Sequence, residues 1–213
     1  ARVEGELVAR SFTEGGTVER GQQLFQIDPE QFEASLAEAE ADLKSQRVGA
    51  ANALRNLERG KELSKTGFIS NSDLDQLVTT SSQADASVRA AEANLEKAEL
   101  NLQYTKITAP FTGKIGKVKF NVGNFVTPQS ESLASLISVD PMYVNFQLEE
   151  ARYLDILQMP DDVQNEIDLT LRLPNNQIYG LQGKVNFADT SVDESTGTVA
   201  IRAEFPNPNN SLV

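Results

Sequence analysis

The chain has 213 residues and contains neither cysteine nor histidine. These two absences exclude disulfide scaffolds, thiolate nucleophiles, histidine general bases, and zinc sites built from cysteine or histidine. The net charge is -12, from 31 acidic and 19 basic side chains, which argues against a nucleic-acid partner because phosphate neutralisation needs clustered lysine and arginine.

The sequence shows no sign of a membrane segment. No apolar run approaches the roughly 20 residues that span a bilayer, and residues 1–5 do not have the pattern of a signal peptide. We therefore expect any membrane anchor or export signal to lie outside this sequence.

The sequence repeats itself on the two sides of a long insertion. Glycine and apolar positions in residues 5–18 recur with one constant offset in residues 113–126, and the register resumes at 24–29 and 136–141. Glycines separate short apolar stretches within each copy, which is typical of strands. Because repeats signal duplicated supersecondary units, we expect two halves of a β-sandwich. The matching pairs are Gly5 with Gly113, Leu7 with Ile115, Phe12 with Phe120, Gly15 with Gly123, and Val18 with Val126.

Two long helices are predicted between these halves. Small or apolar residues alternate at steps of four and three, as in a coiled-coil seam. Many seam positions are alanine or serine, so each buries little area and the helices can approach closely. We expect an antiparallel hairpin on the order of 50 Å long at ~1.5 Å per residue. The seam positions are Phe32, Leu36, Ala39, Leu43, Gln46, Ala50, Ala53 and Leu57, then Leu74, Leu77, Ser81, Ala84, Val88, Ala91, Leu95, Ala98 and Leu102.

Both helices carry start signals. Asp28 is expected at the N-cap of the first helix, with Pro29 at the first helical position and Gln31 closing a capping box. The second helix is expected to begin at Ser70, in a capping box with Asp73.

The far end of the hairpin is predicted to be tight and relatively basic. Gly67 can take the left-handed conformation that ends the first helix. Acidic side chains come early in that helix and basic ones late, which suits its macrodipole. Since a thin arm has little core of its own, we predict that it serves to extend the protein's reach.

After residues 140–141 the pattern changes to alternating strands with a short helix at 149–157. The acidic stretch 187–198 is interpreted as a solvated turn, because it lacks the spacing of an EF-hand calcium loop. Strands are expected at 142–148, 167–173, 183–187 and 198–205.

Together, the glycine-rich halves around a capped hairpin resemble the periplasmic adaptor proteins, or membrane fusion proteins, of RND-type tripartite multidrug efflux pumps. Residues 14–28 are similar to a lipoyl domain, and residues 104–116 to the family's return segment. Residues 187–198 and 205–210 are similar to its β-barrel, which has six strands and one helix at its mouth. The resemblance covers essentially the whole chain.

The resemblance implies an α+β multidomain fold with a split lipoyl-like β-sandwich, an antiparallel α-helical coiled-coil hairpin, and a partial antiparallel β-barrel. The implied domains are residues 1–28 for lipoyl-like half 1, 29–105 for the hairpin, 106–140 for lipoyl-like half 2, and 141–213 for an incomplete β-barrel. The last barrel strand and the membrane-proximal domain of the family are expected to lie outside this sequence.

The hairpin tip carries the sharpest match. Adaptors that work with TolC-like outer-membrane channels have an Arg, Leu, Ser pattern, and Arg59, Leu63 and Ser70 stand at the family's spacing. Arg59 can bind carbonyls or carboxylates, Leu63 can fill an apolar slot, and Ser70 can bond backbone. Each also has a structural interpretation: a solvated charge for Arg59, seam packing for Leu63, and an N-cap for Ser70.

The resemblance implies a non-enzymatic adaptor without cofactor or metal site. Its partners would be an RND-type inner-membrane transporter and a TolC-like outer-membrane channel, for export of drugs or other small molecules. It would lie in the periplasm, anchored to the inner membrane through a segment outside this sequence. The family also implies self-association into a hexamer, and lysine-rich residues 106–139 could pair with acidic residues 140–213 of a neighbour.

Two alternatives stay open. One is an adaptor of an ABC-type export or secretion system. The other is a lipoyl or biotinyl carrier domain, but a carrier needs a modifiable lysine where its halves join, and here Asp28 and Pro29 lead into the helical arm. A copper or silver efflux adaptor would need soft ligands, for which the chain offers only Met142 and Met159.

Overall fold

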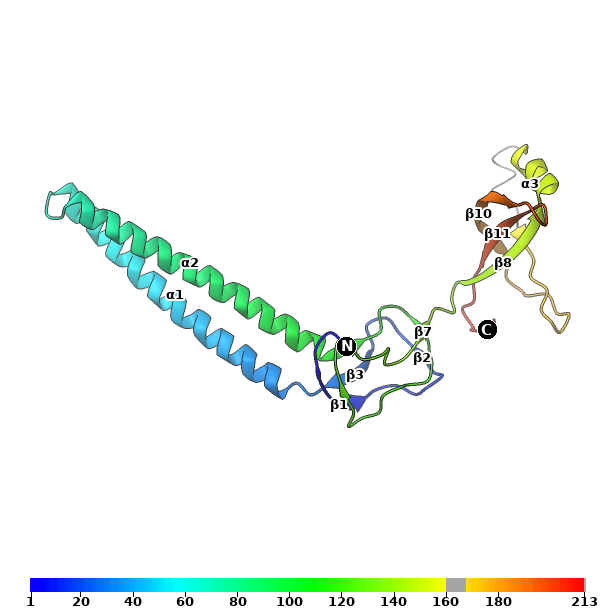
Figure 1. The fold of residues 1–213 in the computed structure, drawn as a ribbon, viewed down its shortest axis with the longest axis horizontal. Coiled ribbons are helices and arrows are strands. Elements are labelled where there is room, and N and C mark those ends of the chain that lie inside the picture. The colour runs from blue at the N-terminus through cyan, green and yellow to red at the C-terminus, as the bar shows by residue number, and fades with distance from the viewer. Residues whose placement is uncertain (160–167, 213) are drawn as a thin grey trace. The chain divides into compact units, whose positions relative to one another are not determined.

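The structure is a computed structural model that describes residues 1–159 and 168–212, in two compact units (Figure 1). The hairpin unit comprises Ala1–Thr13, Gly21–Ala109 and Lys117–Ala134. The C-terminal unit comprises Glu14–Arg20, Pro110–Gly116 and the residues from Ser135 onward. None of the described helices combines the length and the apolar character that a bilayer crossing needs.

A four-stranded antiparallel sheet forms the base of the hairpin unit. Its apolar side chains alternate along the strands, and Leu7, Ile27 and Val126 are completely buried. The strand order is β4-β3-β1-β6, with β1 at Gly5–Arg10, β3 at Gln23–Ile27, β4 at Lys106–Thr108 and β6 at Phe125–Val126.

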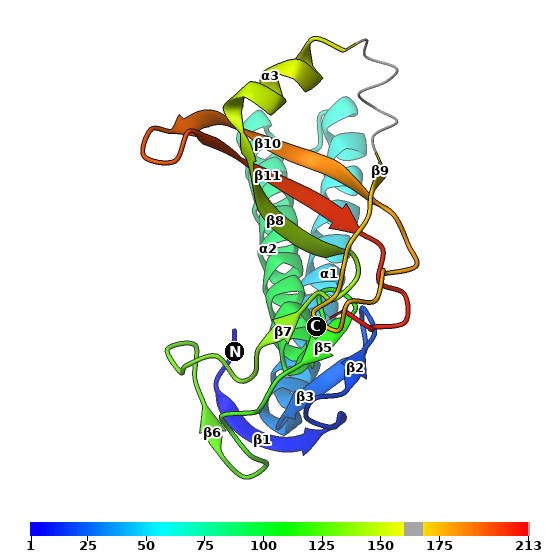
Figure 2. The same cartoon turned by 90° about the vertical axis from the view of Figure 1, so that its right-hand side faces the viewer.

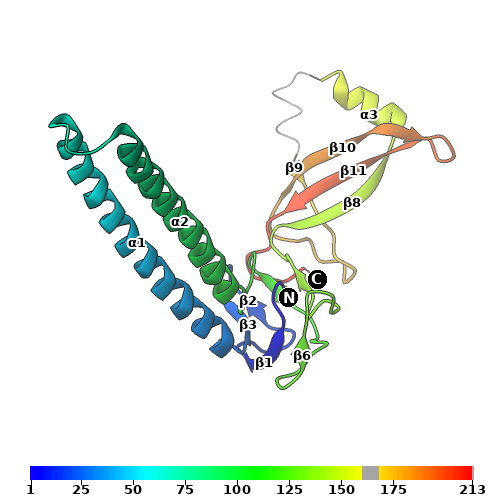
Figure 3. The same ribbon diagram turned by 60° about the vertical axis from the view of Figure 1, so that its left-hand side comes forward.

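Two helices leave this sheet from neighbouring strands. β3 leads into α1 (Glu30–Lys65), and α2 (Asn71–Tyr104) leads back into β4. Because β3 and β4 are paired, the start of α1 lies beside the end of α2, and the helices run side by side in opposite directions (Figures 1 and 3). Every seam position expected from the sequence is buried or half-buried, which confirms the predicted seam.

A hydrogen-bonded threonine ties the end of α2 to β3. Thr105 is completely buried, and its hydroxyl donates to the Leu102 carbonyl at 2.7 Å. Its carbonyl accepts from the amide of Ile27 at 2.8 Å, and its hydroxyl accepts from Gln26 Nε2 at 3.1 Å. The roots of both helices are therefore fixed to each other through the sheet.

The start of α1 differs from the prediction. Pro29 occupies the N-cap, no side chain makes a cap hydrogen bond, and the capping box with Gln31 is wrong. The reason is that Pro29 already has helical angles, φ -86° and ψ -13°, and its carbonyl accepts from the amides of Phe32 and Glu33. Asp28 Oδ1 instead accepts from the Glu30 amide at 3.1 Å.

The C-terminal unit contains a small three-stranded antiparallel sheet of order β2-β5-β7, at Thr17–Val18, Gly113–Ile115 and Leu136–Ile137. Val18 and Ile115 are almost completely buried in it. Both belong to the sequence repeat, and so do the buried Leu7 and Val126 of the hairpin unit.

The two copies of the repeat pair with each other in a reciprocal way. The glycine that begins each copy pairs with the valine that ends the other copy. Backbone hydrogen bonds from the glycine turns also connect each copy to the other. This reciprocity confirms the internal repeat and makes each copy incomplete without the other. The paired residues are Gly5 with Val126 and Val18 with Gly113, and the matching amide-to-carbonyl bonds run from Gly123 to Leu7 at 2.8 Å and from Gly15 to Ile115 at 2.9 Å.

The rest of the C-terminal unit is a four-stranded antiparallel sheet of order β8-β11-β10-β9 (Figure 2). The strands expected at 142–148 and 198–205 and the helix expected at 149–157 are confirmed within one residue. Ala203, Phe205 and Leu212 form the buried core. The elements are β8 at Met142–Glu149, α3 at Glu150–Leu157, β9 at Asp168–Leu169, β10 at Gly183–Asp193 and β11 at Thr198–Phe205.

Two predictions for this sheet are wrong. Of the strand expected at 167–173, residue 167 lies outside the described residues, β9 ends at Leu169, and Arg172 makes only an isolated bridge with Ile178. β10 continues to Asp193, because irregularities in the register with β11 let the strand run through the acidic stretch. The solvated turn is thus shorter than expected and closes at Gly197, whose φ is 63°. The described residues of this sheet form four strands, as expected for an incomplete barrel.

A buried asparagine links the segment before β8 to the segment after β11. Asn207 is completely buried, and its Nδ2 donates to the carbonyls of Val139 at 2.7 Å and Leu212 at 3.0 Å. Its Oδ1 accepts from the Leu212 amide at 3.0 Å, and its own amide donates to Asp140 Oδ1 at 2.7 Å. The chain entering β8 is therefore held to the chain leaving β11.

Candidate docking tip of the helical hairpin

The turn between α1 and α2 is locked by backbone hydrogen bonds. Gly67 has a φ of 77°, in the left-handed region, as the sequence predicts. Its amide donates to Ser64 at 3.0 Å, and the Phe68 amide donates to Leu63 at 3.0 Å. These two bonds make a Schellman motif, and the Thr66 hydroxyl adds a bond to the same Leu63 carbonyl at 2.9 Å.

Ser70 closes the turn on the side of α2. Its Oγ accepts from the Asp73 amide at 3.1 Å, and the Asp73 carboxylate accepts from the Ser70 hydroxyl at 2.7 Å and the Ser70 amide at 3.2 Å. The predicted capping box is confirmed. The hydrogen bond from the Ser70 hydroxyl is the main cause that lowers the pKa of Asp73.

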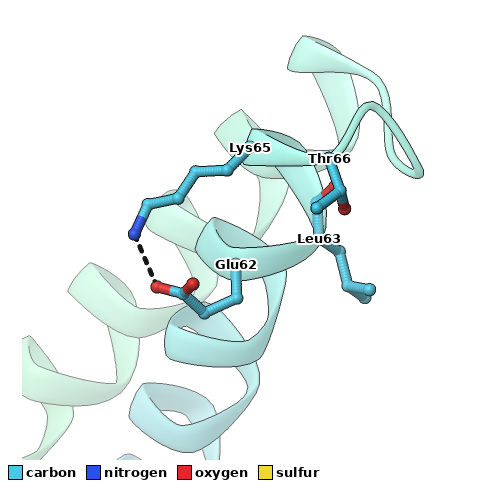
Figure 4. A network of polar contacts seen from close by, with 4 residues as sticks. All are labelled: Glu62, Leu63, Lys65 and Thr66. Atoms are coloured by element: carbon cyan, nitrogen blue, oxygen red, sulfur yellow. Dashed lines mark hydrogen bonds and ion pairs between the residues drawn. The ribbon is translucent and has the colours of Figure 1, made fainter.

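Arg59 and Leu63 both face solvent. Leu63 is 46% exposed and lies off the seam, which rules out the seam-packing interpretation. Its side chain points away from the ion pair between Lys65 and Glu62, whose Nζ and Oε1 are 2.6 Å apart (Figure 4). Arg59 is exposed, and its Nη2 donates to Asn56 Oδ1.

A groove of about 430 Å³ between the helices brings the predicted residues together. Arg59 and Leu63 line it directly, whereas Ser70 borders it through its capping partner Asp73. The other lining residues are Asn56, Gly60, Ile69, Gln76 and Leu77.

Sequence reasoning missed two residues of the tip. Gly60 is buried between the helices, at the seam position that follows Leu57, but a glycine does not register in an apolar pattern. Phe68 is 79% exposed at the turn, and its signal in the sequence is a large aromatic residue directly after a helix-ending glycine. Together with the half-exposed Leu63, Phe68 gives the tip two exposed large apolar side chains.

Across residues 1–159 and 168–212, no group of three or more acidic side chains is placed to hold a metal ion. What the tip offers is an ordered apolar and charged surface.

Comparison with known proteins agrees with this architecture. The family model of the RND MFP (membrane fusion protein) barrel-sandwich hybrid domain matches residues 1–144, and that of the RND MFP β-barrel domain matches residues 141–213. The structure of an efflux transporter of Bacteroides eggerthii has a TM-score of 0.69 at 19% identity, over 98% of this chain and 57% of that one. These findings confirm the predicted fold class.

Curated relatives align along the entire chain. The multidrug export protein AcrE of Escherichia coli is 37% identical over 220 residues, which cover 100% of this chain and 57% of AcrE. The efflux pump periplasmic linker BepF of Brucella suis is 39% identical over 215 residues, which cover 100% of this chain and 52% of BepF. The chain thus spans about half the length of the curated relatives it matches. With both family models matched, the chain belongs to the RND-type membrane fusion proteins.

Proposed function

We propose that the whole protein is a non-enzymatic periplasmic adaptor that links an RND-type inner-membrane transporter to a TolC-like outer-membrane channel. The exported compounds would be drugs or other small molecules. Support comes from the relatives, whose names describe multidrug export and a periplasmic linker of an efflux pump. Anchoring to the inner membrane, through a segment outside this sequence, belongs to the same proposal.

The hairpin tip is the proposed contact with the channel, through Arg59, Leu63 and Ser70. The observation that carries this assignment is the exposure of Leu63 and Phe68 on a turn that is already ordered. An ordered turn loses little conformational entropy on docking, so its apolar contacts contribute more of their energy to affinity. Arg59 has further guanidinium donors besides the one that binds Asn56.

We further propose that the protein works as a hexamer, with the domains divided at residues 1–28, 29–105, 106–140 and 141–213. The helix bounds Glu30–Lys65 and Asn71–Tyr104 support the limits of the second domain. The opposite charges of residues 106–139 and 140–213 support contact between neighbouring copies.

The test is photo-crosslinking of the full-length protein in cells. A photoreactive residue at Leu63 should capture an outer-membrane channel, identified by mass spectrometry. A residue at Val48, which is also exposed and lies on α1 far from the turn, is the control and should not capture it. Capture of only neighbouring copies from Leu63, or of nothing, would contradict the docking role.

Charge reversal gives a second test of the same tip. Arg59→Asp should abolish efflux, because it reverses the charge at the proposed contact with the channel. The protein should still fold, because the side chain is exposed. Arg55→Asp, at another exposed arginine of α1, is the matched control and should retain efflux. Equal efflux from the two variants would remove Arg59 from the contact.

A further inference from the structure

The root of the helical hairpin, at the opposite end from the tip, has an open cleft of about 710 Å³. The first turns of α1, the last turns of α2 and the N-terminal residues 2–4 form its walls, with Pro128 beside them. All of these residues belong to the hairpin unit. The volume lies in the range of roughly 300–1,000 Å³ that is typical of sites for small molecules.

One wall of the cleft is apolar. Val3 is buried, and Phe32 and Ala39 of α1 are half-buried. The N-terminal segment lies beside the end of α2 (Figure 3), where the guanidinium carbon of Arg2 is 4.9 Å from the centre of the Tyr104 ring. A flat apolar molecule can therefore pack against this wall.

The charged side chains of the cleft are mainly acidic. Glu38 and Asp42 lie one turn apart on α1, where two like charges repel each other. Asp42 Oδ1 accepts only a neutral hydrogen bond, from Gln46 Nε2 at 3.1 Å. Within residues 1–159 and 168–212, no ion pair joins either of them to a base. The charged lining residues are Glu4, Glu38 and Asp42 against Arg2 and Lys97.

We infer that this cleft binds an organic cation with a flat apolar body. The positive charge lies at Glu38 and Asp42, where it relieves the repulsion between the two acids. The apolar body packs against Phe32 and removes apolar surface from water. This site is separate from the hairpin tip, and the docking function stands whether or not the cleft binds a molecule.

Other classes of ligand fit the cleft less well. An anion would face the repulsion of three acidic side chains. A metal ion would need a compact set of oxygen ligands, and the described residues hold no group of three acidic side chains placed for one. The combination of an apolar wall with unpaired acids favours an organic cation.

The first test compares two dyes that share a xanthene ring system and differ in charge. Rhodamine 123 is a cation and fluorescein is an anion. Fluorescence anisotropy with the purified full-length protein should show binding of rhodamine 123, and binding of fluorescein should be at least about fivefold weaker. Added salt should weaken the binding of rhodamine 123, because the acids are exposed.

The second test removes the two acids of α1. Glu38→Gln combined with Asp42→Asn should weaken the binding of rhodamine 123 about fivefold, as expected for the loss of two exposed charge contacts. Glu58→Gln combined with Glu62→Gln is the matched control, because these exposed acids have the same spacing on the same helix and lie outside the cleft. The control should bind the dye like the wild type.

The third test fills the cleft. Ser35 is exposed and lines it, whereas its neighbour Ala34 is exposed and does not. Ser35→Trp should therefore lose the binding of rhodamine 123, and Ala34→Trp should retain it. Melting of the helical circular dichroism signal checks that both variants are folded.

Three results would each overturn the inference. They are equal binding of the two dyes by the wild type, equal losses in the two double variants, and unchanged binding in Ser35→Trp. Crosslinking from Leu63 tests the docking function in a separate experiment, so failure of the one is distinguishable from failure of the other.

Discussion

The hairpin shaft and the sheet of β8 to β11 are held together in different ways. Along the shaft most seam residues are only half-buried, and the buried ones are Leu43, Leu57 and Gly60 in α1 and Ala91 in α2. In β11, by contrast, every second side chain from Val199 to Phe205 is buried. Each residue of the shaft therefore buries little apolar area, whereas a few side chains of the sheet bury much of theirs. The shaft gains stability from its length, and the sheet can be small.

The largest loss is expected in the sheet. Phe205→Ala removes a buried ring from the core and should lower the free energy of unfolding of this sheet by about 3–5 kcal/mol. Phe187→Ala, at a half-exposed ring on the neighbouring strand, should cost about 1 kcal/mol or less. Hydrogen exchange of residues 198–205 measures the difference, and equal losses would show that the core is not concentrated at Phe205.

A smaller loss is expected in the shaft. Leu57→Ala should lower the stability of the hairpin by about 2 kcal/mol, the low end for a buried leucine, since a two-helix shaft can close partly around the gap. Leu54→Ala, three residues earlier and half-exposed, is the control and should change little. Thermal melting of the helical circular dichroism signal gives the comparison. A larger loss of stability for Leu54→Ala than for Leu57→Ala would show that the seam does not run along the helix face that contains Leu57.

A still smaller loss of stability is expected for a substitution in the turn at the tip. Gly67→Val forces a β-branched residue into the left-handed region, at a cost of about 1–2 kcal/mol, and should fray the end of α1. Gly67→Asn is the control, because asparagine tolerates this conformation. Amide exchange at Phe68 reports the Schellman hydrogen bond, and unchanged exchange in the valine variant would contradict the left-handed assignment.

The smallest effect is a dependence on pH at the start of α2. The bonds from Ser70 lower the pKa of Asp73 in the folded state, so the stabilisation is present above the ordinary pKa of an aspartate, about 3.9. It is lost as the pH falls through the lowered value. Titration of the Asp73 carboxyl carbon by NMR measures this, with Ser70→Ala as the comparison. An unchanged titration midpoint in Ser70→Ala would exclude the capping hydroxyl as the cause.

The sequence predicts the shaft better than the sheet because the shaft depends on local spacing. Seam positions such as Leu43 and Ala91 follow from steps of three and four residues, and Ser70 and Gly67 act within one turn of their own position. The sequence pattern did not predict a role for Gly60, because this residue contributes by having no side chain. That contribution is recognised only when the structure places Leu77 against it. The helix α1 begins one residue later than predicted, because Pro29 occupies the N-cap position and not the first helical position.

In the sheet, distant partners decide the boundaries. β10 runs to Asp193 because β11 pairs with it there. The acidic sequence of residues 189–194 contains no pattern that predicts this pairing. Asn207 reads as a loop residue, yet it is buried by bonds to Val139 and Leu212. Arg59, Leu63 and Ser70 were proposed because they resemble the family's tip pattern, whereas the groove beside them depends on packing between the two helices and could not be predicted.

The reciprocal pairing of the repeat also has a consequence for synthesis on the ribosome. The outer edge of β1 pairs with Phe125 and Val126, which are made long after Gly5 and Glu6. At roughly 5–20 residues per second, this edge waits on the order of ten seconds for its partner, while α1 and α2 can already join. An unpaired strand edge invites association with other chains, so the nascent protein is most vulnerable before its second half emerges.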